Sequence, residues 1–334
     1  MHYNALSFPQ RTVGEALGGT MKSTRTTMLA AAAASALLLG VGATSAQNAA
    51  PAAGETFSKT CRVTQARNNA IQKQEPFKAF DNLYYVGPCY VAVWILTTPQ
   101  GHIMFDTAQE PFVDDVIANI QKVGINPRDI KYIVLSHGHL DHVGGAARLQ
   151  EVTGARVVAV AEDWDMIAAL DGKVGNRDPK PNRVPKRDMV VKEGDTLKLG
   201  DQALTFHQMP GHTPGVLTTE GIKVRDSGQT YTAILMGGGG YRGGLKEAEQ
   251  SVVTADRVAA IKGVQVNMQI HSWAEPAGYP GGGVLERSFK LKDRKPGDPN
   301  PFVDPVTWEA RAKAAQAGAR RAVETEKAKA AAPK

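Results

Sequence analysis

Cysteine is scarce in this chain, which has only two among 334 residues, Cys61 and Cys89. Structural zinc sites are usually closed by several cysteine thiolates, so this scarcity argues against a cysteine-rich zinc site. Two cysteines can still pair if the protein is exported to an oxidising compartment. We therefore expect a disulfide between Cys61 and Cys89, with two free buried thiols as the alternative.

An apolar run long enough to cross a membrane is also missing. The N-terminal run from Met28 to about Val41 is shorter than the roughly 20 residues that a transmembrane helix needs. Lys22 and Arg25 precede this run and small residues up to Ala46 follow it, which is the pattern of a secretory signal.

We expect residues 1–46 to be a signal peptide that is removed, with Met21 as an alternative start. The mature protein would begin near Gln47 and be periplasmic or secreted, without stable membrane insertion. A membrane anchor formed by the same apolar run is the alternative.

The chain has a formal net charge of +6, but its central part has no basic excess. Residues 1–46 hold three Lys/Arg against one acid, and residues 308–334 hold seven against three. Residues 47–307 hold 29 of each sign. No nucleic-acid-binding surface is therefore expected on the folded body, and the partner we expect is a small-molecule substrate. The sequence predicts no oligomeric state.

Hydrophobic residues make up 42% of the chain, enough to fill a large core, and their spacing alternates between strand and helix periods. Strand patterns lie at 82–87, 90–98, 101–108, 132–137, 156–162, 189–215, 222–238 and 264–271, and helix patterns lie at 111–124, 144–154, 162–170, 246–262 and from Trp308 onward. This order is typical of an α/β protein in which two β-sheets pack together with helices outside.

Three of the eight histidines fall in the short stretch "SHGHLDHVGG" (136–145), which holds His137, His139, Asp141 and His142. Imidazole and carboxylate together form a ligand set for a divalent metal, above all zinc. The stretch follows a strand pattern and precedes a helix pattern, which is where open α/β sheets usually place their sites.

In an extended backbone, His137, His139 and Asp141 would project to the same side, whereas His142 would face the other way. Four donors that cannot all reach one ion suggest two metal ions. Such a pair bridges a water and polarises a carbonyl or phosphoryl oxygen. A closed structural zinc site is the alternative for this cluster.

Further ligands must come from elsewhere, and His212 in "PGHTPG" and His271 in "QIHSW" are the candidates. Each has a simpler interpretation, as a turn residue or as a residue at a strand end. His207 in "LTFHQM" is a rival to His212 but fits a core or surface position. His2 precedes the expected cleavage and His102 lies at a turn, so neither is a good candidate.

Four segments and a last histidine occur in a characteristic order: "EPFKAFDNLYYVG", "ILTTPQGHIMFDTA", "SHGHLDHVGG", "PGHTPG" and a histidine after a β-type run. This series resembles the metallo-β-lactamase superfamily, and in particular the third subclass of metallo-β-lactamases. The resemblance implies an α/β fold of four layers, an αβ/βα sandwich in which two mixed β-sheets pack together and helices cover the outer faces.

The same resemblance implies a site with two zinc ions. One ion would be held by His137, His139 and His212, and the other by Asp141, His142 and His271. Asp106 matches the superfamily's first acidic motif and would orient the ligands from behind. Asp141 is also the candidate catalytic carboxylate.

The resemblance also divides the chain. We expect a linker or extension at 47–74, the metallo-β-lactamase-like domain at 75–310, and a C-terminal helix with an Ala/Lys-rich tail at 311–334. Residues 171–188 are rich in Pro, Gly and Lys/Arg, so they are expected to form a solvated loop, with a flap beside the site as the alternative.

The chain departs from the family pattern after the strand "TAILM". Thioesterases and lactonases of the superfamily place a metal-bridging aspartate there, and the third-subclass lactamases place an Asp-Ser segment that helps hold the substrate carboxylate. This chain has "GGGG" (237–240) instead, and "HSW" (271–273) where those lactamases usually have His-Pro. We therefore expect weakened lactam anchoring. The glycine run lacks the Lys-Ser/Thr of a phosphate-binding loop.

The leading hypothesis is an exported zinc-dependent hydrolase in which metal-bound hydroxide attacks a carbonyl, with β-lactam hydrolysis as the first candidate activity. A lactone, ester or amide hydrolase with the same chemistry is the first alternative. A non-catalytic periplasmic metal-binding protein is the second alternative.

Overall fold

The computed structural model describes Cys61 and residues 69–175, 178, 180–241, 243–272 and 282–331. The expected signal peptide, most of the expected linker and Trp273 of the "HSW" segment lie outside the described residues.

Seven strands form the first sheet, in the order β1-β2-β3-β4-β5-β6-β7. They are β1 (Phe77–Phe80), β2 (Leu83–Tyr85), β3 (Trp94–Thr98), β4 (Gly101–Phe105), β5 (Ile130–Val134), β6 (Arg156–Val160) and β7 (Met189–Val191). The first four pair antiparallel through short turns, and β4 to β7 pair parallel. Parallel neighbours need crossover connections, and each of the three connections between β4 and β7 contains at least one helix.

Five strands form the second sheet, in the order β12-β11-β10-β9-β8. They are β8 (Thr196–Leu199), β9 (Gln202–Gln208), β10 (Leu217–Asp226), β11 (Gln229–Leu235) and β12 (Val266–Met268). All neighbours pair antiparallel except β11 and β12, which are parallel. Both sheets are therefore mixed.

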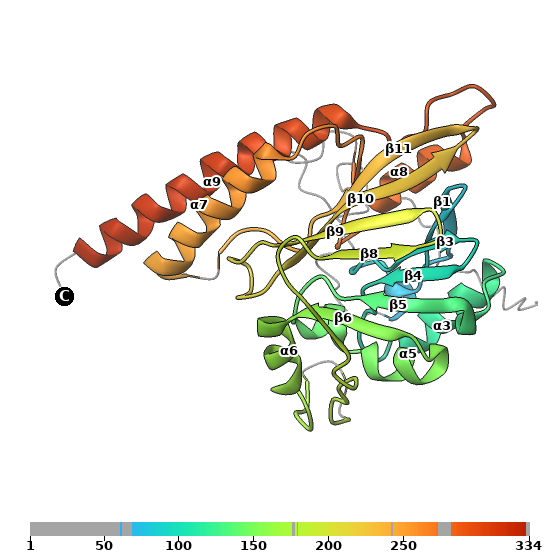
Figure 1. Cartoon of the computed structure of the whole chain (residues 1–334), viewed down its shortest axis with the longest axis horizontal. Coiled ribbons are helices and arrows are strands. Elements are labelled where there is room, and N and C mark those ends of the chain that lie inside the picture. The colour runs from blue at the N-terminus through green and yellow to red at the C-terminus, as the bar shows by residue number, and fades with distance from the viewer. Residues whose placement is uncertain are drawn as a thin grey trace, which may run out of the picture. The chain divides into compact units, whose positions relative to one another are not determined.

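The helices occur between and after the strands. They are α2 (Asn69–Gln72), α3 (Val113–Lys122), the 3-10 helix η2 (Pro127–Asp129), α4 (Leu140–Val143), α5 (Ala146–Thr153), α6 (Ala161–Ala168), α7 (Leu245–Ala260), α8 (Val284–Lys292) and α9 (Pro305–Ala331). Figure 1 shows α3, α5 and α6 beside the first sheet, and α7 alongside α9.

Alternating burial along the strands explains the layers. Val134 of β5 packs into the core between the two sheets, whereas its neighbour Ile133 packs into a second core under α3 and α5. In the same way Leu235 of β11 faces the inter-sheet core, and Ile234 packs with residues of α7 and α9. A strand whose two faces are both apolar needs another layer of secondary structure packed against each face. The predicted four-layer αβ/βα sandwich is therefore confirmed.

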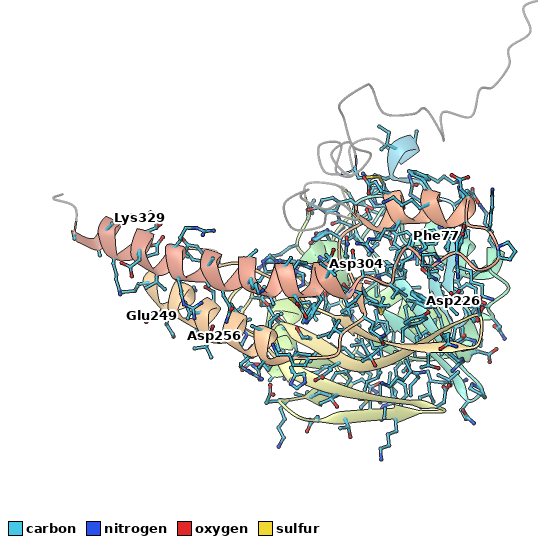
Figure 2. All side chains as sticks on the ribbon, turned by 90° about the horizontal axis from the view of Figure 1, so that it is seen from above. Phe77, Asp226, Glu249, Asp256, Asp304 and Lys329 are labelled. Atoms are coloured by element: carbon cyan, nitrogen blue, oxygen red, sulfur yellow. A yellow bond between two sulfur atoms is a disulfide. The ribbon has the colours of Figure 1, made fainter. Side chains whose placement is uncertain are left out.

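The last helix, α9, runs beside α7. Asp256 of α7 accepts hydrogen bonds from Gln316 at 2.8 Å and from Arg320 at 3.0 Å. Figure 2 labels Asp256 on α7 and Lys329 near the end of α9. The helix begins at Pro305, inside the range expected for the main domain, and is continuous across residue 311. Among the described residues, none of the helices has the length and apolar character that a membrane span requires.

Cys61 and Cys89 form a disulfide, with 5.4 Å between their Cα atoms, as the sequence predicts. Both residues are fully buried. Gln72 of α2 accepts a hydrogen bond from the Cys89 backbone N–H at 2.8 Å on its carbonyl, and another from the Tyr90 N–H at 2.9 Å on its side chain. The disulfide therefore fixes the segment that leads into β3.

Candidate metal centre

The metal-ligand stretch begins where β5 ends. His137 is fully buried, and a single helical turn, α4, starts at Leu140 with His139 as its N-cap. A helical turn rotates the side chains of neighbouring residues away from a strand's two-fold alternation. Asp141 therefore does not project with His137 and His139, and the alternation predicted from an extended backbone is wrong at this residue.

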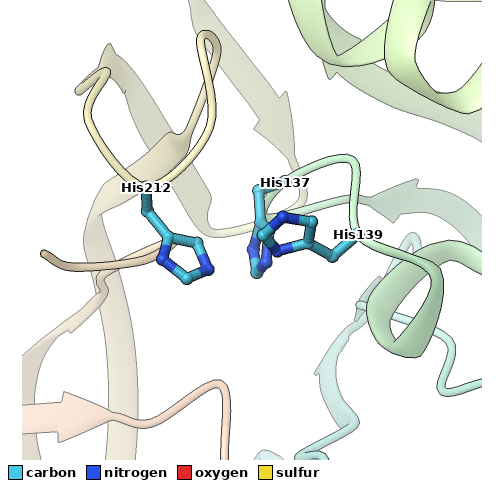
Figure 3. Close-up of side chains that lie close together, drawn as sticks. All are labelled: His137, His139 and His212. Carbon is cyan, nitrogen blue, oxygen red and sulfur yellow. The ribbon is translucent and has the colours of Figure 1, made fainter. Parts of the chain in front are cut away.

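The first group of histidines, which we name the tri-histidine group, consists of His137, His139 and His212. Their ring centroids lie 4.7 to 4.8 Å apart, and the rings meet nearly at right angles. Figure 3 shows the three imidazoles converging from two loops. One ligand nitrogen from each lies within 4.8 Å of the others, which is close enough for them to share a metal ion.

The second group, which we name the Asp-His-His group, consists of Asp141, His142 and His271. His142 Nε2 lies 3.3 Å from His271 Nε2 and 3.6 Å from Asp141 Oδ2, and the remaining distance, from His271 Nε2 to Asp141 Oδ2, is 3.9 Å. Tetrahedral ligands at about 2.0–2.1 Å from zinc stand roughly 3.3–3.4 Å apart. The spacing of these three atoms therefore suits a shared zinc ion.

Orienting hydrogen bonds place lone pairs where a metal would need them. His142 Nδ1 lies 2.8 Å from Asp106 Oδ2, and His271 Nδ1 lies 3.2 Å from the Tyr90 carbonyl. Both partners are acceptors, so each Nδ1 donates and each Nε2 keeps a lone pair. When both rings are neutral, these two lone pairs face each other at 3.3 Å, and a cation bound between them would satisfy both.

His137 has the same arrangement. Ser136 Oγ donates to Asp106 Oδ2 at 2.7 Å, so His137 Nδ1 must donate to this hydroxyl at 3.1 Å. The lone pair is then on His137 Nε2, which is buried without a hydrogen-bond partner. A buried polar atom without a partner is costly, and a metal ion would satisfy it.

The pKa values of the histidines follow from their burial. Burial lowers the pKa of His137 well below its usual value, and the imidazoles around it lower it further. Burial likewise lowers the pKa of His271, helped by His142. Burial alone would lower the pKa of His142, but the carboxylates of Asp141 and Asp106 outweigh it and raise this pKa. His137 and His271 are thus neutral near pH 7, which is the form that binds metal.

Asp106 lies behind the ligands, where the sequence placed it. Its carboxylate is 1% exposed and accepts from the Ser136 N–H at 2.7 Å, from the Ser136 hydroxyl at 2.7 Å and from His142. Its backbone has a φ of 57°, a left-handed conformation that is uncommon for residues other than glycine. Strain of this kind concentrates at functional sites.

The glycine run has a structural reason. A Cβ added at Gly237 would lie 2.1 Å from the Leu217 carbonyl oxygen and 2.7 Å from that of Ser136, so no side chain fits there. A Cβ at Gly238 would lie 3.0 Å from His212 Cδ2. An aspartate or serine at Gly237 is therefore excluded by backbone atoms, and a side chain at Gly238 would press on the imidazole of His212.

Among the described residues, two histidines lie outside both groups. His207 of β9 is held between Glu193, at 3.0 Å, and Glu220, at 2.7 Å, so it does not compete with His212. His102 is on β4, away from the ligands.

The Pro- and Lys-rich loop reaches the ligand stretch. Within it, Gly172 and Lys173 exchange backbone hydrogen bonds with Asn182. A Cβ added at Gly175 would lie 3.2 Å from Leu140 Cδ2, the residue between His139 and Asp141. Most described residues of 171–188 are exposed, as expected for a solvated loop, and the part at Gly175 also lies next to the ligand stretch.

Comparison with known proteins finds a family match in the middle of the chain. Residues 86–221 match the family model of the metallo-beta-lactamase superfamily. A hydroxyacylglutathione hydrolase of Cereibacter sphaeroides is 35% identical over 100 residues, 30% of this chain and 31% of that protein. One of Maricaulis maris is 31% identical over 109 residues, 33% of this chain and 35% of that protein. The chain thus matches about a third of the length of these relatives.

Solved structures match over a greater length. BJP-1, a subclass B3 metallo-β-lactamase of Bradyrhizobium japonicum, is 29% identical, with a TM-score of 0.65 over 78% of this chain and 97% of that one. FEZ-1, a metallo-β-lactamase from Legionella gormanii, is 25% identical, with a TM-score of 0.66 over 77% and 98%. With its two layered sheets and its two groups of ligand atoms, the chain contains a region, residues 86–221, that matches the metallo-β-lactamase superfamily, and subclass B3 enzymes are among its structural neighbours.

Proposed function

We propose that this protein is a zinc-dependent hydrolase of a carbonyl compound, with β-lactams as the leading substrate class. The observation that carries the proposal is the adjacency of the two ligand groups. His137 of the tri-histidine group and His142 of the Asp-His-His group have ring centroids 4.1 Å apart. Two ions held so close together would act on one substrate.

The donor set supports zinc. Five imidazoles and one carboxylate suit a borderline-soft ion, whereas magnesium and calcium prefer oxygen ligands. The described residues contain no cysteine at either group, so the site differs from the closed, thiolate-rich type of structural zinc site. This difference favours a catalytic site over a purely structural one.

When bound, a metal pair lowers the pKa of a water and polarises the substrate carbonyl. The chain's own residues prepare this chemistry. Asp106 and Ser136 fix the ring orientation of His142 and His137, and the Tyr90 carbonyl fixes that of His271. We assign Asp141 as the carboxylate that accepts a proton from the attacking water, because it is the one acid within either group.

The glycine at position 237 bears on the substrate. In this superfamily a metal-bridging aspartate after this strand is typical of thioesterases and lactonases, whereas this chain has four glycines there (237–240), and at Gly237 backbone atoms leave no space for a side chain. The structural neighbours agree, since BJP-1 and FEZ-1 are metallo-β-lactamases that match over 97% or more of their length. β-Lactams are therefore favoured over thioesters, with lactones, esters and amides as the remaining candidates.

A weak substrate anchor follows from the same glycines. Without side chains at Gly237 and Gly238 to contact a lactam carboxylate, ground-state and transition-state binding weaken together. We expect a raised KM with little change in kcat, which is the pattern of lost uniform binding.

Export fits the disulfide. A bond between Cys61 and Cys89 persists in an oxidising compartment and rarely in the cytosol. We therefore infer a periplasmic or secreted protein. Mass analysis of the protein recovered from the periplasm, with cleavage expected near Ala46, tests this inference.

The central experiment combines metal analysis with a hydrolysis screen. The purified protein is expected to contain two zinc ions and to hydrolyse β-lactams in a screen that includes lactones and thioesters. Chelation should abolish the activity and zinc should restore it. His212→Ala should remove activity, whereas His207→Ala, outside the site, should not. Zinc-loaded protein that hydrolyses none of these compounds would refute the proposal.

A further inference from the structure

One buried carboxylate has no place in the site described so far. Asp163 is in the first turn of α6, yet its side chain points inward and the residue is 1% exposed. Both of its carboxylate oxygens are buried. Among the described residues, no donor makes a hydrogen bond of ordinary length and angle to either oxygen. Buried carboxylates are rare unless they are paired, so this residue needs a reason.

Asp163 lies between the two loops that carry the tri-histidine group. Gly138 separates His137 from His139, and a Cβ added there would lie 3.4 Å from Asp163 Oδ1 and 3.2 Å from its backbone carbonyl oxygen. Gly215 is on the loop of His212, and a Cβ there would lie 2.4 Å from Asp163 Oδ2. A side chain at Gly215 would collide with the Asp163 carboxylate, and one at Gly138 would collide with Met166 Cβ, at 2.8 Å, on the same helix. Glycine at these two positions therefore lets both loops lie against α6.

Three donors face this carboxylate. They are the Thr213 hydroxyl and the backbone N–H groups of Gly138 and Val216, all of which favour the ionised form. Burial acts in the opposite direction and outweighs them, so the pKa of Asp163 is raised to about 6. One donor comes from the loop of His137 and His139, and two come from the loop of His212.

We propose that Asp163 is a positioning residue for the tri-histidine group, joining the loop of His137 and His139 to the loop of His212. This proposal rests on the proposed function only in that both require a metal ion at this group. Asp163 contacts the loops of the tri-histidine group, whereas the histidines of the Asp-His-His group are oriented by Asp106 and by the Tyr90 carbonyl. Its loss should therefore weaken one ion selectively.

The test is metal titration of Asp163→Ala and Asp163→Asn, with zinc and with cobalt. For Asp163→Ala we expect zinc affinity at the tri-histidine group to fall about ten- to a hundredfold, as for other residues that orient ligands. The Asp-His-His group should keep its ion, so protein dialysed against a weak chelator should contain one equivalent of metal instead of two. The visible absorption of bound cobalt should lose the component from the three-imidazole site.

The control variants separate positioning from folding. Glu162→Gln alters the neighbouring acid, which is exposed on the same turn, and should retain both ions. Asp163→Asn keeps the shape of the side chain and one oxygen acceptor. Its zinc affinity at the tri-histidine group should therefore lie between those of Asp163→Ala and the wild type. Thermal unfolding of each metal-free variant reports any general loss of stability.

The outcomes separate this proposal from the proposed function. Loss of both ions in parallel, or unchanged affinity at both groups, would overturn the role of Asp163. A wild-type protein that binds two ions but hydrolyses nothing would refute the proposed function and leave the metal titration decisive for Asp163. A wild-type protein that binds no metal would overturn both.

Discussion

The ring of Tyr90 packs against the imidazole of His271, with 4.8 Å between the ring centroids, and the Tyr90 carbonyl accepts a hydrogen bond from His271 Nδ1 at 3.2 Å. Tyr90 follows Cys89, and both are held by Gln72. The disulfide is therefore connected to a metal-ligand candidate through two adjacent residues. The first prediction follows from this connection.

Removing the disulfide should weaken the Asp-His-His group. In Cys61→Ser/Cys89→Ser we expect reduced affinity for one metal ion, since the segment that orients His271 is no longer fixed. The loop closed by the bond spans 28 residues, so stability should also fall by about 3 kcal/mol. Metal titration and chemical denaturation measure the two effects. Equal weakening at both groups would contradict the connection through Tyr90.

Replacing a ligand should remove activity but not the fold. His139→Ala is expected to abolish turnover, because the tri-histidine group loses one donor, while the sheets keep their cores. Far-UV circular dichroism should be unchanged. His102→Ala is the matched control, and it should retain turnover because His102 is away from both groups. Full activity of the His139 variant would exclude the proposed ligand set.

Gly237 should tolerate no side chain. Gly237→Ala is expected to destabilise the protein by about 1–3 kcal/mol, the range for overpacking, because its Cβ would meet the backbone of Leu217 and Ser136. Gly239→Ala is the control, since its Cβ would contact only the flexible end of Met236 at 3.2 Å. Denaturation midpoints decide the comparison, and similar values for the two variants would show that the backbone yields easily.

An ion pair far from the metal ligands should give acid sensitivity. Arg294 donates to both oxygens of Asp226, at 2.8 and 2.7 Å, and these bonds lower the pKa of Asp226. A lowered folded-state pKa means that the stabilisation is present above the unfolded value of about 3.9 and is lost as pH falls through the folded value. Asp226→Asn should lower the free energy of unfolding by about 1–2 kcal/mol at neutral pH and by less in acid.

This prediction is best measured on chelated protein, so that metal loss in acid does not contribute. Asp165→Asn provides the control, because the ion pair of Asp165 with Arg187 is exposed and should add little stability. A stability difference between Asp226→Asn and wild type that does not shrink in acid would contradict the linkage.

The sequence predicts the layers and most of the elements, because apolar spacing reports directly which faces are buried. Strands β4 and β6 lie within the ranges expected for them, and β5 begins two residues before its expected range of 132–137. Strand β1 was not among the strand patterns, since a four-residue edge strand with a partly exposed end has little periodicity to detect. Asp141 was misplaced relative to His137 because a single helical turn leaves no signature in so short a stretch.

The groups that orient the ligands are harder to predict. Periodicity cannot show that Tyr90 meets His271 or that Asp163 meets Gly138, because these contacts join loops far apart in the chain. The residues alone also left His207 as a rival to His212. Only the fold shows that two glutamates already hold His207.

One backbone hydrogen bond has a consequence for motion. The Leu217 N–H donates to the Ser136 carbonyl at 2.7 Å, and this bond links the second sheet to the first immediately before His137. A hinge movement that opened the sandwich would break this bond and separate His137 from His212. This bond therefore opposes any opening of the two sheets at the point where the metal ligands meet.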